Sequence, residues 1–404
     1  MSLDAGVGPG LIQRQFYGLS ITAGLALGLT APLTAVLAVE LGATPFAAGI
    51  SVASLTAVVF VMDIVGTRLL PFLEPRRAIT QGMLLWAFGS FGSAVAPTFE
   101  IMAAARLVQG IGLAQYAAAA PQLAVKLAGT TRVAQTMGRF QAAMTLGSAI
   151  GPLSGGLVTQ VGGGTLGLRL AFAVCGVIAL ICAAWAWAVL PTTPSATKPR
   201  LSLPRLPGMG SSRALLGLLL GTSAQGLRGA ITLTIVPLVA AEQLGMDIAW
   251  LGVFLTFMYV IEVVAMTSIG PLSDRRGRRT SMLAGSVCGG IGVVLILVAI
   301  STQSPVIFFL GALPLGVASG CMFSVTPAVL VDIAGTAEVG LSATRIARDL
   351  GFTIFTVGVG AVITASSASV ALWSCVGAYG LVALLMIVIG ETHRGGRSRR
   401  AVPG

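Results

Sequence analysis

The sequence contains few charged residues for its length. Only 9% of its 404 residues are charged, whereas about 25% is usual for a soluble domain. A soluble fold of this size needs more charge to cover its surface, but a lipid-facing surface accepts apolar side chains. The hydrophobic share of 55% and the 53 glycines fit that environment, because small residues let membrane helices approach closely. The composition therefore predicts a membrane protein.

Residue types that carry chemistry are also scarce. The single histidine, His393, lies in the polar C-terminal tail, which excludes a histidine proton relay inside the membrane. No nucleotide-binding loop is present, so ATP is excluded as the energy source. No metal or nucleophile constellation supports an enzyme, and we expect no cofactor. The cysteines stand singly in apolar stretches without metal or redox spacing, and we interpret all five as packing residues: Cys175, Cys182, Cys288, Cys321 and Cys375.

The formal net charge of +11 raises the possibility of a nucleic-acid partner. The arginines, however, fall in short clusters between apolar runs. No segment combines basic residues with interleaved aromatic residues, as grooves for nucleic acid do. We therefore expect no nucleic-acid partner.

Long apolar runs can be counted along the chain. Each holds about 20 or more residues, the length that crosses a hydrocarbon core of roughly 30 Å. The first run is too long for the apolar region of a signal peptide and lacks a credible cleavage site, so we expect it to be retained. The predicted helices span residues 15–40, 47–70, 78–97, 100–125, 137–162, 169–190, 214–241, 248–270, 281–301, 305–331, 341–366 and 368–390.

Positive charge alternates between the loops that join these segments. The odd-numbered loops contain a single basic residue, Arg169. By the positive-inside rule the even-numbered loops and both termini are cytoplasmic. The even-numbered loops hold Arg68, Arg76, Arg77, Lys126, Arg132, Lys198, Arg200, Arg205, Arg213, Arg275, Arg276, Arg278 and Arg279.

A basic stretch rich in proline and serine divides the chain into two halves of similar length. Arg76 and Arg77 follow the second predicted helix, as Arg278 and Arg279 follow the eighth. This offset near half the chain length indicates two six-helix repeats, an architecture suited to alternating access. The expected domains are an N-terminal six-helix bundle (1–190), a cytoplasmic linker (191–213), a C-terminal six-helix bundle (214–390) and a basic cytoplasmic tail (391–404).

The sequence from Gly270 to Arg279 reads GPLSDRRGRR. It resembles the GxxxD(R/K)xGRR signature of the major facilitator superfamily. The resemblance implies an all-α polytopic membrane protein with twelve transmembrane helices in two pseudo-symmetric six-helix bundles. It also implies a loop that latches the two halves in the outward-facing state, whereas the simpler interpretation is a topogenic basic loop. The corresponding first-half loop, from Gly66 to Arg77, lacks an acidic residue four positions after its glycine and is two residues longer.

In this motif we expect Gly270 to allow close packing and a turn, and Gly277 to give a tight loop. Asp274 is placed to meet positive groups or a helix N-terminus, and a contact with the start of the eleventh helix is one option. The residues assigned to the conformational latch are Gly270, Asp274, Gly277, Arg278, Arg279, Arg345 and Arg348.

The fifth predicted helix carries regularly spaced glycines. Gly147, Gly151 and Gly155 are four residues apart and share one helix face. The pattern resembles the antiporter signature of drug:proton exporters in the same superfamily, which implies a hinge between bundles; generic small-residue packing is the alternative. The full set is Gly138, Gly147, Gly151, Pro152, Gly155 and Gly156.

Ionisable residues inside membrane segments are functional candidates, because each costs about 2.5–3.5 kcal/mol at a helix centre. Arg228 and Glu262 both fall near the midplane of their helices. Either Glu262 exchanges a proton and is stabilised by Arg228, or the two form a permanent structural pair. Asp63 is a second proton site or a structural partner of a basic residue. Arg106 begins a sequence that resembles the family's RxxxG motif, which implies proton transfer; snorkelling to the interface is the alternative.

These features together predict a secondary transporter that exports small amphiphilic compounds, such as a drug, an antibiotic or a secondary metabolite, in exchange for protons. The first helix lacks the carboxylate that many exporters of lipophilic cations carry, so neutral, zwitterionic or weakly anionic substrates stay open. One rival is an importer or facilitator for a sugar or other nutrient, and another is a receptor or enzyme that transports nothing. We expect a monomer whose partners are its substrate, protons and the lipid bilayer, in a bacterial cytoplasmic membrane.

Overall fold

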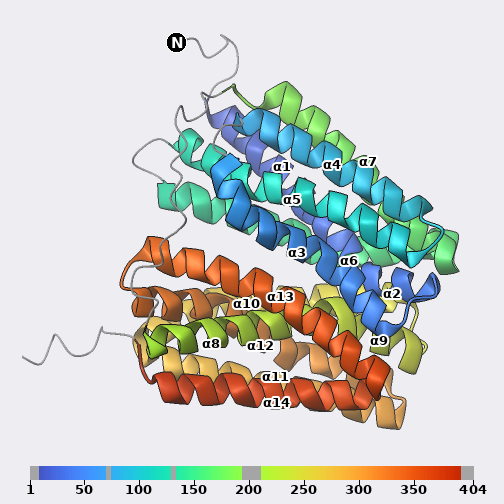
Figure 1. Ribbon diagram of the computed structural model, residues 1–404, viewed down its shortest axis with the longest axis vertical. Coiled ribbons are helices and arrows are strands. Elements are labelled where there is room, and N and C mark those ends of the chain that lie inside the picture. The colour runs from blue at the N-terminus through green and yellow to red at the C-terminus, as the bar shows by residue number, and fades with distance from the viewer. Residues whose placement is uncertain (1–8, 70–73, 129–132, 193–210, 393–404) are drawn as a thin grey trace, which may run out of the picture. The chain divides into compact units, whose positions relative to one another are not determined.

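A computed structural model of the chain describes residues 9–69, 74–128, 133–192, 211–392. Nearly all of these residues are helical, and no strand occurs among them (Figure 1). Within the helices, the side chain of Asp63 and the surroundings of Gly138 fall outside the description. Most of the predicted linker and tail also lies outside the described residues.

Each of the twelve predicted segments corresponds to one helix or to helices in series. The first segment is divided near Pro32, and the eighth continues to Arg276, beyond the predicted end at residue 270. The helices are α1 (Pro9–Thr30), α2 (Leu33–Glu40), α3 (Pro45–Leu69), α4 (Pro75–Val95), α5 (Phe99–Ala128), α6 (Val133–Gly162), α7 (Gly164–Val189), α8 (Ser212–Ala230), η2 (Ile231–Ile235), α9 (Val236–Leu238), η3 (Val239–Gln243), α10 (Ile248–Arg276), α11 (Arg278–Thr302), α12 (Pro305–Ala334), α13 (Ala337–Ala365) and α14 (Ala368–Ile389).

Among the described residues, nine continuous helical stretches are long and apolar enough to cross a bilayer. They include the stretch from α8 to η3 and each helix from α10 to α14. This length and composition confirm the prediction of an all-α polytopic membrane protein.

The described chain divides into two compact units. The first comprises residues before 204 together with 247–256, and the second comprises 204–246 together with the residues from 257 onwards. In the first unit α1 packs on α6, and α4 packs on α5 and α7. In the second unit α8 packs on α13, and α11 packs on α12 and α14. The same helix pairs therefore recur at equivalent positions, as expected for two pseudo-symmetric six-helix bundles.

Glycines set the closest packing of the first unit. A methyl group added at Gly147 would overlap the carbonyl oxygen of Ile21, and one at Gly151 would overlap the backbone of Gly28. The α1 and α6 backbones can touch only because these positions lack a side chain. The glycine face that the sequence assigned to a hinge is thus occupied by α1 of the same unit.

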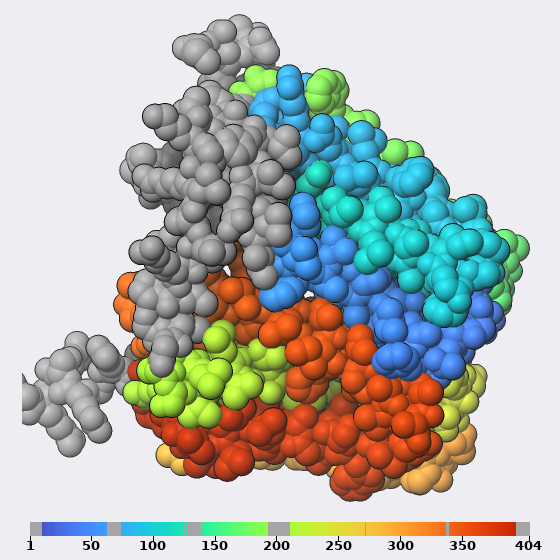
Figure 2. Space-filling view, in the orientation of Figure 1, coloured from blue at the N-terminus to red at the C-terminus, as the bar shows by residue number. Residues whose placement is uncertain are grey.

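The second unit has the same kind of close glycine contact between the equivalent helices. A methyl group at Gly226 on α8 would meet the carbonyl oxygen of Gly351 on α13, and one at Gly351 would meet the backbone nitrogen of Gly226. Figure 2 shows α8, α13 and α14 side by side on one face of this unit. This contact fixes α8 just before the turn that carries Arg228.

The helix that begins as α8 changes geometry after Arg228. Two π-helical segments, η2 and η3, flank a short α-helical turn that contains Pro237. Proline supplies no backbone N–H and crowds the preceding turn, so it favours a wider local geometry. Such irregular turns inside helices are frequent at functional sites.

Candidate functional site

The structure brings Arg228 and Glu262 together near the middle of their helices. The Nε of Arg228 donates to Oε1 of Glu262 at 2.9 Å, and NH2 lies 2.7 Å from the same oxygen. The other carboxylate oxygen, Oε2, is buried and has no hydrogen-bond partner among the described residues. One oxygen of Glu262 therefore makes both contacts with Arg228, while the second oxygen is an unused acceptor.

Two aromatic rings flank the guanidinium. Its central carbon lies 5.8 Å from the ring centroid of Tyr259 on α10 and 5.3 Å from that of Phe323 on α12. Both distances are within the range of cation–π attraction, which stabilises an arginine removed from water. The charged pair therefore sits between aromatic walls.

The close approach of α12 to α10 depends on Gly316 and Gly320. A methyl group at Gly320 would lie 2.7 Å from the Glu262 carbonyl oxygen, and one at Gly316 would lie 2.7 Å from that of Met258. Without these glycines the helices would separate and move Phe323 away from Arg228. The site is thus built from three helices, α8, α10 and α12.

Gln225, one turn before Arg228, is a further polar group at this depth. Its Nε2 donates to the carbonyl oxygen of Met322 at 3.2 Å, and its Oε1 is buried without a partner. Sequence reasoning missed both Gln225 and Phe323. The glutamine was visible as a polar residue in an apolar run, but nothing in the sequence placed α12 beside α8.

Arg106 occupies a separate polar cluster in the first unit. Its side chain is only 3% exposed, and NH1 donates to Oε1 of Gln109 at 2.6 Å. Gln109 in turn donates to Ser90, and the Ser90 hydroxyl donates to Cys175. Arg106 is therefore held inside the unit, and the snorkelling alternative is not what the structure shows.

Pro152 and Gly156 of the glycine-rich motif contact the first turns of α10, which belong to the same unit. The backbone N–H of Leu153 donates to the Thr256 hydroxyl at 3.0 Å. A methyl group added at Gly156 would lie 2.8 Å from the Cα of Ala249. Gly252 packs in the same way against the carbonyl of Pro152. Two faces of α6 thus rest on close backbone contacts, one with α1 and one with the start of α10.

The loop assigned to the latch forms a charged network within the second unit. Arg278 pairs with Asp274 at 2.5 Å and with Asp332 at 3.4 Å. Gly277 has φ = +100°, a conformation that glycine adopts without strain, so the expected tight loop is present. Glu391 accepts hydrogen bonds from the backbone N–H groups of Arg278 and Arg279 at the start of α11.

Other latch expectations differ from the structure. Asp274 meets a positive group, as expected, and that group is Arg278 of its own loop rather than a residue of α13. There Arg345 is exposed, and Arg348 pairs with the buried Asp349 at 2.7 Å. No described atom lies within 4 Å of a methyl group built on Gly270, and α10 continues through it without a turn. Within the described part of the second unit, the expected close packing at Gly270 is therefore absent.

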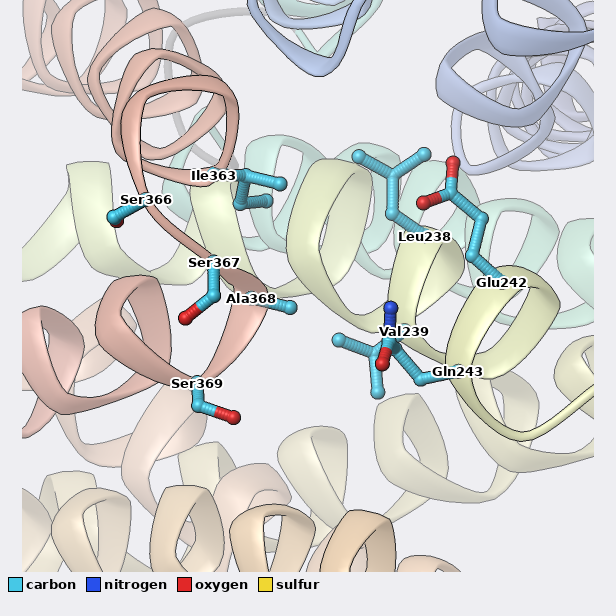
Figure 3. A pocket seen from close by; sticks show the side chains of 9 residues that line it. All are labelled: Leu238, Val239, Glu242, Gln243, Ile363, Ser366, Ser367, Ala368 and Ser369. Atoms are coloured by element: carbon cyan, nitrogen blue, oxygen red, sulfur yellow. The ribbon is translucent and has the colours of Figure 1, made fainter.

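A pocket of about 300 Å³ lies at one end of the second unit (Figure 3). Leu238, Glu242 and Gln243 line one side, and Ser366 and Ser367 lie on the other. None of the residues predicted from the sequence lines this pocket. The candidate site is therefore defined by the buried charges rather than by this pocket.

The long apolar helices and their division into two compact units with recurring helix pairs define an all-α polytopic membrane protein. The sequence matches the family model of the Major Facilitator Superfamily over residues 16–356 and again over 218–402. The chain belongs to this superfamily, whose members are membrane transporters.

Solved structures share the same fold. The nucleoside transporter NupG is 15% identical, with a TM-score of 0.75 over 94% of this chain and 98% of that one. A bacterial homologue of the human lysosomal transporter Spinster, in an inward-facing and occupied conformation, is 14% identical, with a TM-score of 0.75 over 95% of each chain. A comparison with curated protein sequences gave no match. At these identities the likeness shows the fold alone.

Proposed function

We propose that this transporter exports small amphiphilic compounds in exchange for protons by alternating access. The observation that carries the proposal is the buried pair of Arg228 and Glu262, with one carboxylate oxygen left unpartnered. In this proposal Glu262 is ionised and paired with Arg228 in one step of the cycle, and it is protonated at the unpartnered oxygen in another. Such a group can carry one proton through each transport cycle.

The driving force comes from the membrane. Inward movement of one proton gains about 2.3 kcal/mol per 100 mV of membrane potential. Export against a gradient requires that substrate and proton do not occupy the site together, so that each crossing carries one of them. Glu262 meets this requirement if substrate binds the ionised carboxylate and protonation weakens that binding.

The glycine pattern of α6 resembles the antiporter signature, and this resemblance favours exchange over import in the proposal. Its contacts with α1 and with the start of α10 involve backbone atoms directly. Surfaces without side chains offer little resistance to sliding, so α6 is suited to serve as the hinge.

In the same proposal the network of Asp274, Arg278 and Glu391 holds the cytoplasmic end of the second unit as the latch. The chain works as a monomer in a bacterial cytoplasmic membrane, with both termini in the cytoplasm.

The test uses everted membrane vesicles energised to be acidic inside. A panel of neutral, cationic and anionic antibiotics is added, and proton release is recorded for the unaltered protein and for Glu262→Gln. We expect release with at least one compound and its loss in Glu262→Gln. The matched control is Glu242→Gln, the same substitution at an exposed carboxylate of the pocket in Figure 3.

Three other results would change the assignment. Proton release that is unchanged in Glu262→Gln would assign proton coupling to Asp63 and leave Glu262 as a structural partner of Arg228. Equal loss in Glu242→Gln shows that the effect is not specific to the buried pair. No release with any compound, with folded protein in the vesicles, favours import or facilitated diffusion of a nutrient.

A further inference from the structure

The two members of the ion pair present different atoms to a ligand. The side chain of Arg228 is 18% exposed, whereas that of Glu262 is 4% exposed. The NH1 group of Arg228 has no hydrogen-bond partner among the described residues and retains accessible surface, while Oε2 of Glu262 is an unused acceptor. The pair therefore presents an accessible donor, and an unused acceptor lies buried beside it.

A cationic substrate does not fit this arrangement. Arg228 is permanently charged and is the more accessible of the two partners, so an approaching cation meets it before it meets the carboxylate. The rings of Tyr259 and Phe323 lie next to the guanidinium, so a second cation bound against either ring would be repelled by Arg228. Like-charge repulsion in a poorly hydrated site is costly.

An anionic substrate fits the geometry of the ion pair but is not compatible with exchange for a proton. An anion bound to the free edge of Arg228 adds a second negative charge beside Glu262, and a nearby like charge favours protonation of a carboxylate. Binding of the anion and of the proton would then assist each other. That linkage carries both in the same direction, which is cotransport and not exchange.

We infer that the substrate is an uncharged amphiphile that carries a hydrogen-bond donor beside an acceptor, on a flat apolar body. This inference rests on the proposed exchange function. The donor binds Oε2 of Glu262, the acceptor binds NH1 of Arg228, and the apolar body lies against Tyr259 and Phe323. A proton from the outer medium then adds to Oε2, removes the acceptor and displaces the substrate; it leaves to the cytoplasm when the next substrate arrives. No other bond forms or breaks.

Binding is measured with three aromatic probes on the purified full-length protein in nanodiscs. The probes are chloramphenicol, which is neutral and carries hydroxyl and amide groups, ethidium as the cation and nalidixate as the anion. We expect chloramphenicol to bind most tightly. The same probes are then tested for proton release in the everted vesicles described above.

Two substitutions identify the site of binding. Phe323→Leu removes one aromatic wall and is expected to weaken chloramphenicol binding by about 3- to 10-fold, the usual range for one aromatic contact. Phe309→Leu is the matched control, because Phe309 lies four turns earlier on the same helix and is expected to leave binding unchanged. Glu262→Gln replaces the free acceptor with an amide and is expected to weaken binding at least 10-fold.

The outcomes separate the inference from the proposed function. The inference is overturned if ethidium or nalidixate binds more tightly than chloramphenicol, or if no probe binds. It is also overturned if Phe323→Leu and Glu262→Gln leave chloramphenicol binding unchanged. Proton release by ethidium or nalidixate alone also overturns it, although exchange itself then stands. Site-dependent chloramphenicol binding without proton release supports the substrate class and overturns the proposed exchange.

Discussion

Arg228 and Glu262 form an ion pair in which Nε and NH2 of the arginine both contact a single carboxylate oxygen. The geometry leaves Oε2 of the glutamate buried and unpartnered. A pair that served only to join α8 and α10 would gain more by using both oxygens, because two parallel hydrogen bonds are the stronger arrangement. The incomplete pairing leaves one oxygen for the substrate or the proton of the proposed exchange.

The first prediction concerns the stability of this pair. Arg228→Gln strands a buried carboxylate and is expected to lower the unfolding free energy by about 3 kcal/mol. The double substitution Arg228→Gln with Glu262→Gln leaves no buried charge and is expected to recover most of that loss. Thermal unfolding of the purified variants in nanodiscs measures both. If the double variant were as unstable as the sum of the single ones, the two residues would not be coupled.

The second prediction concerns the contact of α1 with α6. Gly151→Ala forces a methyl group into the Gly28 backbone, and backbone cannot move aside as a side chain can. We expect a strong loss of folded protein and a lower unfolding temperature, since helix separation disturbs the whole first unit. The yield of monodisperse protein after membrane extraction measures the effect.

The control is the same substitution on the equivalent helix of the second unit. A methyl group at Gly358 of α13 meets no described atom within 4 Å. Alanine also favours helix by up to about 1 kcal/mol over glycine, so Gly358→Ala is expected to be neutral or slightly stabilising. Equal damage from both substitutions would contradict the packing argument.

The third prediction concerns the buried cluster around Arg106. Gln109→Leu removes the acceptor that lies 2.6 Å from the guanidinium, and the loss is expected to cost about 1.5–3 kcal/mol, the range for a hydrogen bond to a charged group. Gln122→Leu is the control, because this glutamine lies on the same helix but is exposed. Thermal unfolding should separate the two variants, and equal values would show that Arg106 does not depend on Gln109.

Sequence reasoning found the helices because their apolar length is a property of each segment alone. It also placed Arg228 and Glu262 at similar depth, since depth follows from distance along a helix. The neighbours of a residue depend on how helices pack, and single-segment patterns carry no such information. For this reason Phe323 and Gln225 were missed, and Asp274 was not assigned to Arg278 of its own loop.

The buried state of Arg106 was undecided for a related reason. An arginine at this position of the helix can either snorkel to the interface or be buried. The packing of α4 decides between the two, because Ser90 on α4 binds Gln109, which in turn accepts from Arg106. The glycines of α6 were found, but their regular spacing could not tell which helix covers them. The structure shows that α1 does.

The last prediction concerns Glu391, whose two carboxylate oxygens accept from the first two backbone N–H groups of α11. These groups have no partner within the helix, and a negative charge at this end also interacts favourably with the helix dipole. Glu391→Ala is therefore expected to lower the unfolding free energy by about 1 kcal/mol. Because the carboxylate also lies where a side chain at Gly277 would project, its loss should free the loop that carries Asp274 and Arg278.

Hydrogen exchange of the backbone N–H groups of Arg278 and Arg279 measures this loss directly. Exchange should be faster in Glu391→Ala than in the unaltered protein. Glu391→Gln keeps one acceptor oxygen, so its exchange rate should lie between those of the unaltered protein and Glu391→Ala. Glu100→Ala in the first turn of α5 serves as a control at another helix start, and should leave these two groups unchanged. Unchanged exchange in Glu391→Ala would show that the residue does not cap α11, and would remove the C-terminal segment from the proposed latch.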